Sequence, residues 1–114
     1  MTRRLLVVDD DEALLATYRI LSDETLEVVT VTTTAAAREV LQSQGFDWVV
    51  CDWSLARGQT CEELVRELHA DGTRVAILTA DARKVRCPAG VNVLEKPLTL
   101  NEVVAALQDS REDG

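Results

Sequence analysis

Short apolar runs alternate with amphipathic segments along almost the whole chain. The apolar runs are rich in β-branched side chains, which is typical of buried strands. Such runs occupy residues 5–8, 27–32, 48–51, 75–78 and 91–95. Polar or turn-forming residues follow each run, so we expect each strand to end at that point.

The segments between these runs place apolar residues three and four positions apart, the spacing of a helix with one buried face. Thr34 is expected to cap the second helix and Gly45 to end it, while Thr60 and Thr99 each open a capping-box pattern. A polar tail is expected from about residue 108. The predicted helices span residues 12–22, 34–45, 60–72 and those from 99 onward, with Leu14, Tyr18, Leu21, Leu64, Val65, Leu68, Leu100, Val103, Val104 and Leu107 facing inward.

Strands that alternate with helices indicate a parallel sheet covered on both faces. Because crossovers between parallel strands are right-handed, few arrangements remain. We expect an α/β, flavodoxin-like, doubly wound five-stranded sheet of order 2-1-3-4-5, in a single domain over residues 1–114. The window before the fifth strand is short and contains Pro88 and Gly90, so the fourth helix is predicted to be shortened or irregular.

Residues that could carry chemistry gather at the predicted carboxyl ends of the strands. In the expected order, the first and third strands meet at the switch point, where open α/β sheets bind ligands. Carboxylates placed this close raise one another's pKa unless a cation holds them. The sequence therefore predicts a site for a divalent metal with something anionic beside it. Its residues are Asp9, Asp10 and Asp11 after the first strand, Asp52 after the third, Thr79 after the fourth and Lys96 after the fifth.

Composition and charge exclude several classes of function. The chain has 20 acidic and 12 basic residues, a net charge of −8, so we expect no direct binding of nucleic acid. No apolar run approaches the roughly 20 residues of a membrane span, and none near Met1 suits a signal peptide, so a cytoplasmic location without a membrane partner is expected. Met1 stands directly before the first strand, and we expect this amino terminus to be the natural one. The three cysteines indicate neither a disulfide framework nor a zinc site.

The order of these motifs resembles the receiver domain of two-component response regulators. The chain reads Leu-Val-Val-Asp-Asp-Asp-Glu at residues 6–12, and an aspartate closes the third strand. Thr79-Ala80 then follows the fourth strand and Lys96-Pro97 the fifth. The resemblance covers residues 4 to about 107 and implies the CheY-like form of the fold. It also implies a phosphoacceptor signalling domain rather than an enzyme.

The resemblance implies a role for each residue at the strand ends. Asp52 would accept a phosphoryl group from a sensor histidine kinase or a phosphotransfer protein, and the downstream protein partner stays open. Phosphoryl transfer needs positioning and neutralised oxygen charge more than covalent chemistry. The Lys96 ammonium would supply positive charge, and the Thr79 hydroxyl would hydrogen-bond a phosphoryl oxygen. The implied Mg²⁺ ligands are the side chains of Asp10 and Asp52, Asp9 through water, and the backbone carbonyl of Ser54.

Three other interpretations explain parts of the pattern. Asp9-Asp10-Asp11 superficially fits the Asp-x-Asp of haloacid-dehalogenase-like phosphatases, but Glu12-Ala13 lacks their hydroxyl-containing motif and those proteins need a larger, cap-bearing chain. A flavodoxin-type flavin carrier needs a phosphate loop rich in Ser, Thr and Gly after the first strand, where three aspartates would repel a phosphate. Finally, the acidic run could simply cap the first helix, because carboxylates favour helix amino termini.

The chain departs from the receiver pattern on the face that receivers commonly use for output. Val93 stands where an aromatic side chain usually rotates between exposed and buried positions. Ala56 and Thr60 replace the usual Pro and Gly of the loop after the third strand, and the 17 residues from Thr79 to Lys96 are fewer than usual. Two hypotheses follow: a phosphorylatable receiver that signals by protein–protein contact through a non-standard surface, or a receiver-like module that docks partners without phosphorylation.

Overall fold

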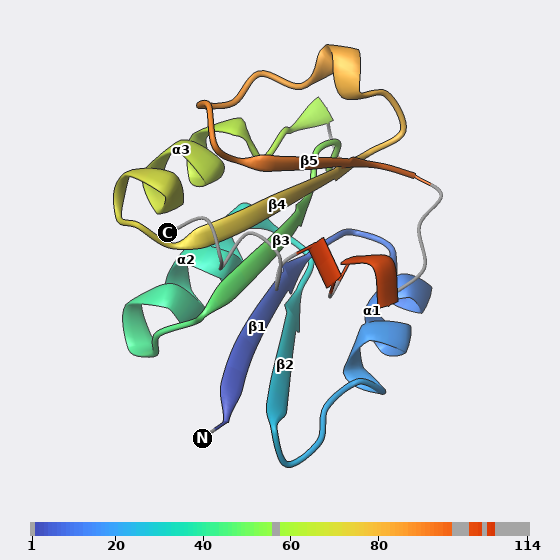
Figure 1. Ribbon diagram of the computed structural model, residues 1–114, viewed down its shortest axis with the longest axis vertical. Helices are drawn as coiled ribbons and strands as arrows, with labels where there is room; N and C mark the ends of the chain where they lie inside the picture. The colour runs from blue at the N-terminus through green and yellow to red at the C-terminus, as the bar shows by residue number, and fades with distance from the viewer. Residues whose placement is uncertain (1, 56–57, 97–100, 104, 107–114) are drawn as a thin grey trace.

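Five parallel strands form the centre of the molecule in the order β2-β1-β3-β4-β5 (Figure 1). The computed structural model describes residues 2–55, 58–96, 101–103 and 105–106. All four strand pairings are parallel, which confirms the predicted flavodoxin-like sheet. The strands are β1 (Arg3–Val8), β2 (Leu26–Val31), β3 (Trp48–Asp52), β4 (Arg74–Thr79) and β5 (Asn92–Glu95).

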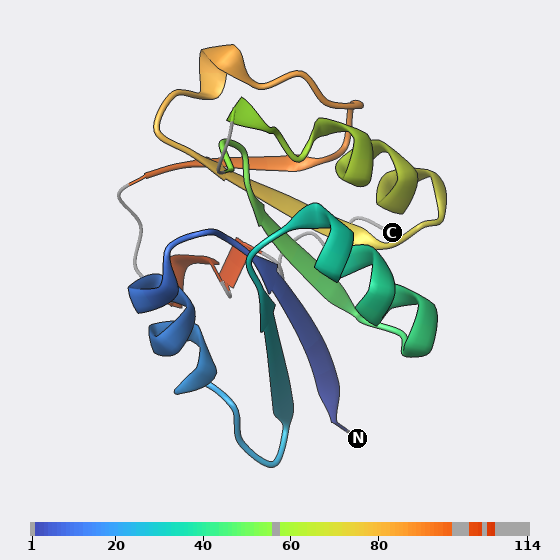
Figure 2. The same ribbon diagram turned by 180° about the vertical axis from the view of Figure 1, so that it is seen from behind.

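Helices cover both faces of the sheet. Figure 2 shows α2 (Thr34–Ser43) and α3 (Glu62–Ala70) side by side on one face, where Ala37 and Leu64 pack on alternate residues of the central strands. On the other face, α1 (Glu12–Arg19) and the helical residues 101–103 and 105–106 bury Leu15, Tyr18 and Val103. Every residue of β3 is buried, so the strand that ends at Asp52 is held from both sides.

The structure corrects several predicted helix ends by one to three residues. Helix α1 ends at Arg19 rather than residue 22. Its buried residues are Leu15 and Tyr18, whereas Leu14 is only half-buried. Thr33, not Thr34, caps α2, because its hydroxyl accepts from the Ala36 N–H at 3.0 Å.

At the other corrected ends, α2 finishes at Ser43, before Gly45. Helix α3 begins at Glu62 with Cys61 at its cap, although the Thr60 hydroxyl does accept from the Glu62 N–H at 3.4 Å. Gly72 follows α3 with a φ of +82°, which agrees with the predicted stop. The expectations for Ala56, Thr99, Leu100, Val104, Leu107 and the polar tail concern residues outside those described.

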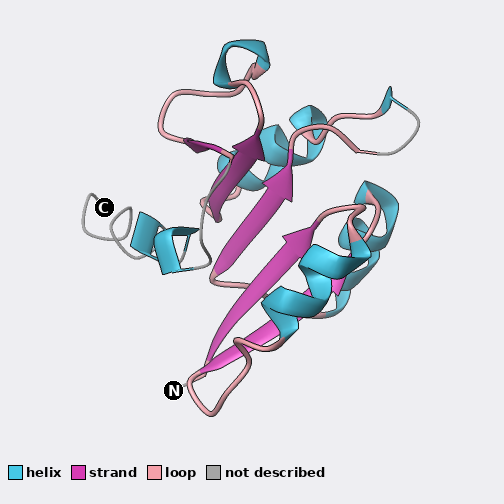
Figure 3. Ribbon diagram, turned by 90° about the vertical axis from the view of Figure 1, so that its right-hand side faces the viewer, coloured by secondary structure: helices cyan, strands magenta, loops and turns pink. Residues whose placement is uncertain are grey.

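The prediction of a shortened or irregular fourth helix is confirmed. Between β4 and β5, a stretch described throughout, the one helical turn is η2 (Ala82–Lys84). In Figure 3 this segment forms the turn at the top of the molecule, beside β4 and β5. The irregular residues that follow η2 still cover the sheet, because Val85, Cys87 and Val91 pack against the α3 side of the core. Within the described part of the chain, no helix is long and apolar enough to cross a membrane.

Candidate acidic site

Three carboxylates meet where β1 and β3 end. Val8 pairs with Cys51 in the sheet, which places Asp9 and Asp52 next to each other beyond the strands. Oxygen atoms of Asp9, Asp10 and Asp52 all lie within 4.8 Å of one another. Among the described residues, this is the one group of three Asp, Glu, His or Cys side chains close enough to share an ion. The structure therefore brings together the three side chains that the sequence predicted as metal ligands.

Asp9 is the most deeply buried of the three. Its residue is 1% exposed, and burial raises the pKa of its carboxyl group above the ordinary range. One oxygen, Oδ1, accepts from the Asp11 N–H at 3.0 Å, whereas Oδ2 is buried and has no hydrogen-bond partner. A buried acceptor without a partner is costly unless a cation or water satisfies it. This orphaned oxygen, beside two further carboxylates, fits a hard divalent cation such as Mg²⁺.

Asp11 has a different role from its two neighbours. Its Oδ1 accepts from the N–H groups of Ala13 at 3.0 Å and Leu14 at 3.3 Å, which makes it the N-cap of α1. The capping interpretation is thus correct for Asp11 alone, while Asp9 and Asp10 join the cluster with Asp52. The three-aspartate run serves both purposes because its last member begins the helix.

Asp52 forms an ion pair with Lys96. The Lys96 Nζ donates to Asp52 Oδ1 at 3.1 Å, and the Lys96 backbone N–H donates to the Thr79 carbonyl at 2.7 Å. Burial raises the pKa of Asp52, the Lys96 ammonium lowers it, and the charge of Asp10 raises it again; the net direction is upward. Desolvation therefore outweighs the single ammonium, since the Asp52 side chain is only 11% exposed. The site holds more negative charge than Lys96 can neutralise.

Thr79 lies buried at the end of β4, and its hydroxyl is hydrogen-bonded to the backbone of Asp81. It accepts from the Asp81 N–H at 3.1 Å and donates to the Asp81 carbonyl at 3.2 Å. Ser54 is exposed in the loop after Asp52, where it forms an isolated antiparallel bridge with Thr60. The structure thus gathers four of the predicted residues, whereas the Thr79 hydroxyl is engaged by a neighbouring turn.

The sequence pattern did not indicate the part that two residues play near the site. Tyr18 was expected only as an inward residue, yet burial and then the charges of Asp9 and Asp52 raise its pKa to about 12. The pattern of strands and helices assigns no role to Asp81, although it lies two positions after Thr79 and two before Arg83. A polar residue so close behind a functional hydroxyl was the available signal, because Asp commonly organises turns.

Two hollows of the described surface lie away from these residues. A cavity of about 190 Å³ lies at the opposite end of β4, around His69, Arg74 and Asn92. Another of about 310 Å³ lies between α2 and α3. Neither is lined by Asp52, so the acidic site is marked by its clustered charged side chains and not by either hollow.

Comparison with known proteins identifies the family. The family model of the response regulator receiver domain matches residues 5–108. The chain belongs to that family. Its receiver fold is a signalling module of two-component systems, and the sheet order matches the CheY-like form.

Curated relatives share the receiver sequence over part of their length. The alginate biosynthesis transcriptional regulatory protein AlgB of Pseudomonas putida is 38% identical over 79 residues, which are 68% of this chain and 18% of that protein. The AlgB protein of Pseudomonas syringae pv. tomato is 37% identical over the same shares of the two chains. The matched stretch thus spans less than a fifth of these relatives.

Solved structures share the fold over nearly the whole chain. The signal receiver domain of an HD domain-containing protein from Pseudomonas fluorescens has a TM-score of 0.82 and 22% identity, covering 99% of this chain and 97% of that one. The response regulator TrrA of Thermotoga maritima, in complex with Mg(2+)-BeF, has a TM-score of 0.79 and 20% identity, covering 96% and 99%. At these identities the likeness concerns the fold.

Proposed function

We propose that this receiver domain accepts a phosphoryl group on Asp52 and uses it to control a protein–protein contact. The donor is a sensor histidine kinase or a phosphotransfer protein. The observation that carries the proposal is the arrangement around Asp52, which combines two further carboxylates within 4.8 Å and an ammonium at 3.1 Å. Surplus negative charge beside one lysine suits a metal-assisted anion site better than a purely structural ion pair.

The chemistry assigns a separate task to each side chain. A carboxylate oxygen of Asp52 attacks the donor phosphorus, a P–O bond forms, and the bond to the donor's leaving group breaks. The Lys96 ammonium neutralises charge on the phosphoryl oxygens, and the Thr79 hydroxyl donates a hydrogen bond to one of them. Bound Mg²⁺ supplies the remaining positive charge. We assign it to the side chains of Asp10 and Asp52, to Asp9 through water, and to the carbonyl of Ser54.

The partner on the output side meets an unusual surface. Val93 has no aromatic ring to rotate, and a three-residue turn, η2, replaces the fourth helix. The curated relatives named above are transcriptional regulators, so we propose a downstream role in transcriptional control for the protein that carries this domain. We propose that this partner contacts a surface other than the one formed by η2 and the β5 residues around Val93.

A second candidate function has two observations in its favour. The Thr79 hydroxyl is already hydrogen-bonded to Asp81, and Val93 cannot act as an aromatic switch. Both features suit a receiver-like module that docks partners without phosphorylation. The two candidates differ in whether Asp52 takes up a phosphoryl group.

Intact-mass measurement separates these two functions. The protein is incubated with a small phosphodonor, such as acetyl phosphate, and millimolar Mg²⁺. A gain of about 80 Da, the mass of one phosphoryl group, supports phosphorylation. The Asp52→Asn variant preserves the shape of the side chain without its nucleophilic charge, and we expect it to show no gain. A wild-type protein that gains no mass would favour the phosphorylation-independent module.

A further inference from the structure

Both hydrogen bonds that the Thr79 hydroxyl makes within the described residues go to Asp81. A hydroxyl group has one proton to donate, and here that proton points to the Asp81 carbonyl at 3.2 Å. The Asp81 N–H meanwhile occupies a lone pair of the same oxygen at 3.1 Å. The hydroxyl must therefore give up its bond to the Asp81 carbonyl before it can donate to a phosphoryl oxygen on Asp52.

The turn that holds Thr79 is fixed by the Asp81 side chain. Asp81 Oδ1 accepts from the backbone N–H of Arg83 at 3.0 Å and so caps η2. The Arg83 guanidinium forks onto the same carboxylate, with Nε at 3.0 Å from Oδ1 and the terminal NH2 nitrogen at 3.2 Å from Oδ2. These bonds to Arg83 hold the pKa of Asp81 below its usual value. The exposed ion pair is weak alone, but it acts on a side chain that the backbone has already positioned.

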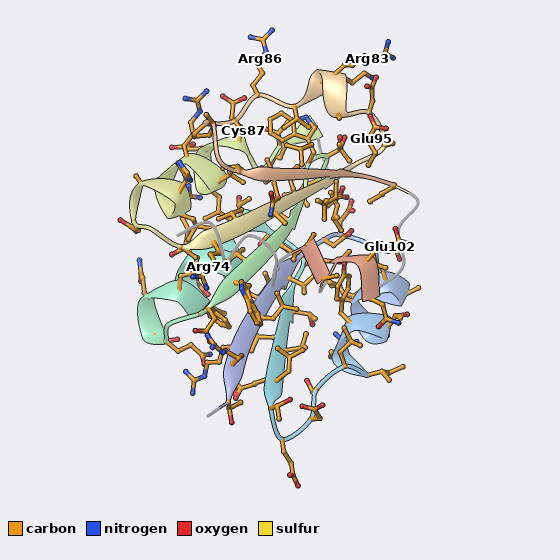
Figure 4. All side chains as sticks on the ribbon, in the orientation of Figure 1. Arg74, Arg83, Arg86, Cys87, Glu95 and Glu102 are labelled. Carbon is orange, nitrogen blue, oxygen red and sulfur yellow. The ribbon has the colours of Figure 1, made fainter. Side chains whose placement is uncertain are left out.

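A third link ties this turn to the neighbouring strand. The Ala82 N–H donates to Glu95 Oε1 at 2.9 Å, and Thr79 and Glu95 are register partners between β4 and β5. Figure 4 shows Arg83 on η2 and Glu95 near the end of β5. The hydroxyl, the turn and the strand end that precedes Lys96 therefore form one connected network.

We infer that Asp81 is a positioning residue, which through its own backbone engages the Thr79 hydroxyl and so keeps it from donating to a phosphoryl group on Asp52. This inference rests on the proposed phosphorylation of Asp52. Phosphoryl uptake then competes with the bond between Thr79 and the Asp81 carbonyl. When the hydroxyl turns to the phosphoryl group, the turn at residues 81–84 loses its contact with β4, and Arg83 moves with it. The turn at residues 81–84 then moves in place of the aromatic side chain that position 93 lacks.

Variants of Asp81 test whether this residue restrains the Thr79 hydroxyl. Asp81→Ala removes the cap of η2, so the hydroxyl is freer to turn and the rate of phosphorylation by a fixed concentration of acetyl phosphate should rise about two- to tenfold, the range for one lost hydrogen bond. Asp81→Asn keeps an oxygen that can accept from the Arg83 N–H, and it should return most of the way to the wild-type rate. Arg86→Ala, an exposed cation of the same segment outside this network, is the matched control and should behave as wild type.

Amide exchange supplies a readout that a merely structural role would not move. In the wild-type protein, phosphorylation should speed exchange of the Asp81 N–H about two- to tenfold, because its acceptor turns away. Suppose that the wild-type protein is phosphorylated. If Asp81→Ala is then phosphorylated at the same rate, or if exchange of the Asp81 N–H does not change on phosphorylation, the inference is wrong and the proposed function stands. A rate that falls in Asp81→Ala together with the melting temperature shows a structural role only and also overturns it. If the wild-type protein takes up no phosphoryl group, both proposals are wrong.

Discussion

Lys96 Nζ lies 3.1 Å from Asp52 Oδ1, so the residue that follows β5 is paired with the last residue of β3 across the intervening strand β4. The direction of the lysine is set by its backbone, because its N–H donates to the Thr79 carbonyl at 2.7 Å. The pair is half-exposed on the lysine side and buried on the aspartate side. Lys96 is thus placed to meet charge that builds up on Asp52.

Replacing Lys96 by methionine should slow phosphorylation of Asp52 about 10- to 100-fold, because a preorganised charge near the transferred group is lost. The side chains have similar length, so the fold should persist. The rate of mass gain with acetyl phosphate and Mg²⁺ measures the effect. Lys84→Met removes an exposed lysine from η2 and serves as the matched control. Equal rates in the two variants would show that the ammonium has no part in the transfer.

Mg²⁺ should stabilise the folded protein through the three carboxylates. A ligand at about ten times its dissociation constant adds roughly 1.4 kcal/mol to the free energy of unfolding, which is several degrees in Tm. Trp53, buried next to Asp52, should report binding through its fluorescence, and a Trp53→Phe variant isolates that signal from Trp48. Asp10→Ala should lose both responses. If millimolar Mg²⁺ changes neither quantity in the wild type, the metal assignment is wrong.

Asp52→Asn should stabilise the metal-free protein at neutral pH, by an amount on the order of 1 kcal/mol. The pKa of Asp52 is raised in the folded state, mainly by burial, above the ordinary value of 3.8. A carboxyl group whose pKa is higher in the folded state than in the unfolded state contributes stability at a pH below its unfolded-state pKa. This contribution is lost as the pH rises through the folded-state pKa. The advantage of the variant should therefore be small near pH 3.5 and grow toward pH 7.

Urea unfolding with a chelator present, at about pH 3.5, 5 and 7, measures this pH dependence. Thr73→Ala, a half-buried position away from the site, controls for changes unrelated to the acidic cluster. An advantage that is constant across this range would mean that relief of the buried charge is not its source.

The sequence predicted the sheet and the composition of the site because both depend on where apolar runs end. Asp9, Asp10 and Asp52 had to meet once β1 and β3 were neighbours, whatever the details of the loops. What could not be predicted was which oxygen meets which donor. The cap of α2 is an example: Thr34 is predicted to cap the helix, but Thr33 does so. The two adjacent hydroxyls offer the same chemistry, and the exact residue at which the helix starts decides which of them forms the bond.

The same limit applies to Thr79 and to the acidic run. The hydroxyl of Thr79 is predicted to bond a phosphoryl oxygen, and the sequence pattern does not show that the turn behind it also offers a donor at 3.1 Å and an acceptor at 3.2 Å. Asp11 was one of three equivalent aspartates in the sequence, and only the position of the helix start makes it the cap. A pattern of residue types does not determine which of several neighbouring polar groups will form a given hydrogen bond.

Phosphorylation should change amide exchange mainly at the turn of residues 79–84 and in the described loop residues after Asp52, and little across residues 91–95. A modification shifts a protein only through interactions that differ between two states. Val93 is half-buried against the core and has no alternative aromatic position to adopt. The Thr79–Asp81 bonds, in contrast, must be exchanged when the hydroxyl turns. The measurement compares exchange with and without acetyl phosphate, with Asp52→Asn as the control for added reagent. Protection changes across residues 91–95 and the start of the last helix as large as those near Asp52 would contradict this prediction and restore the usual receiver switch.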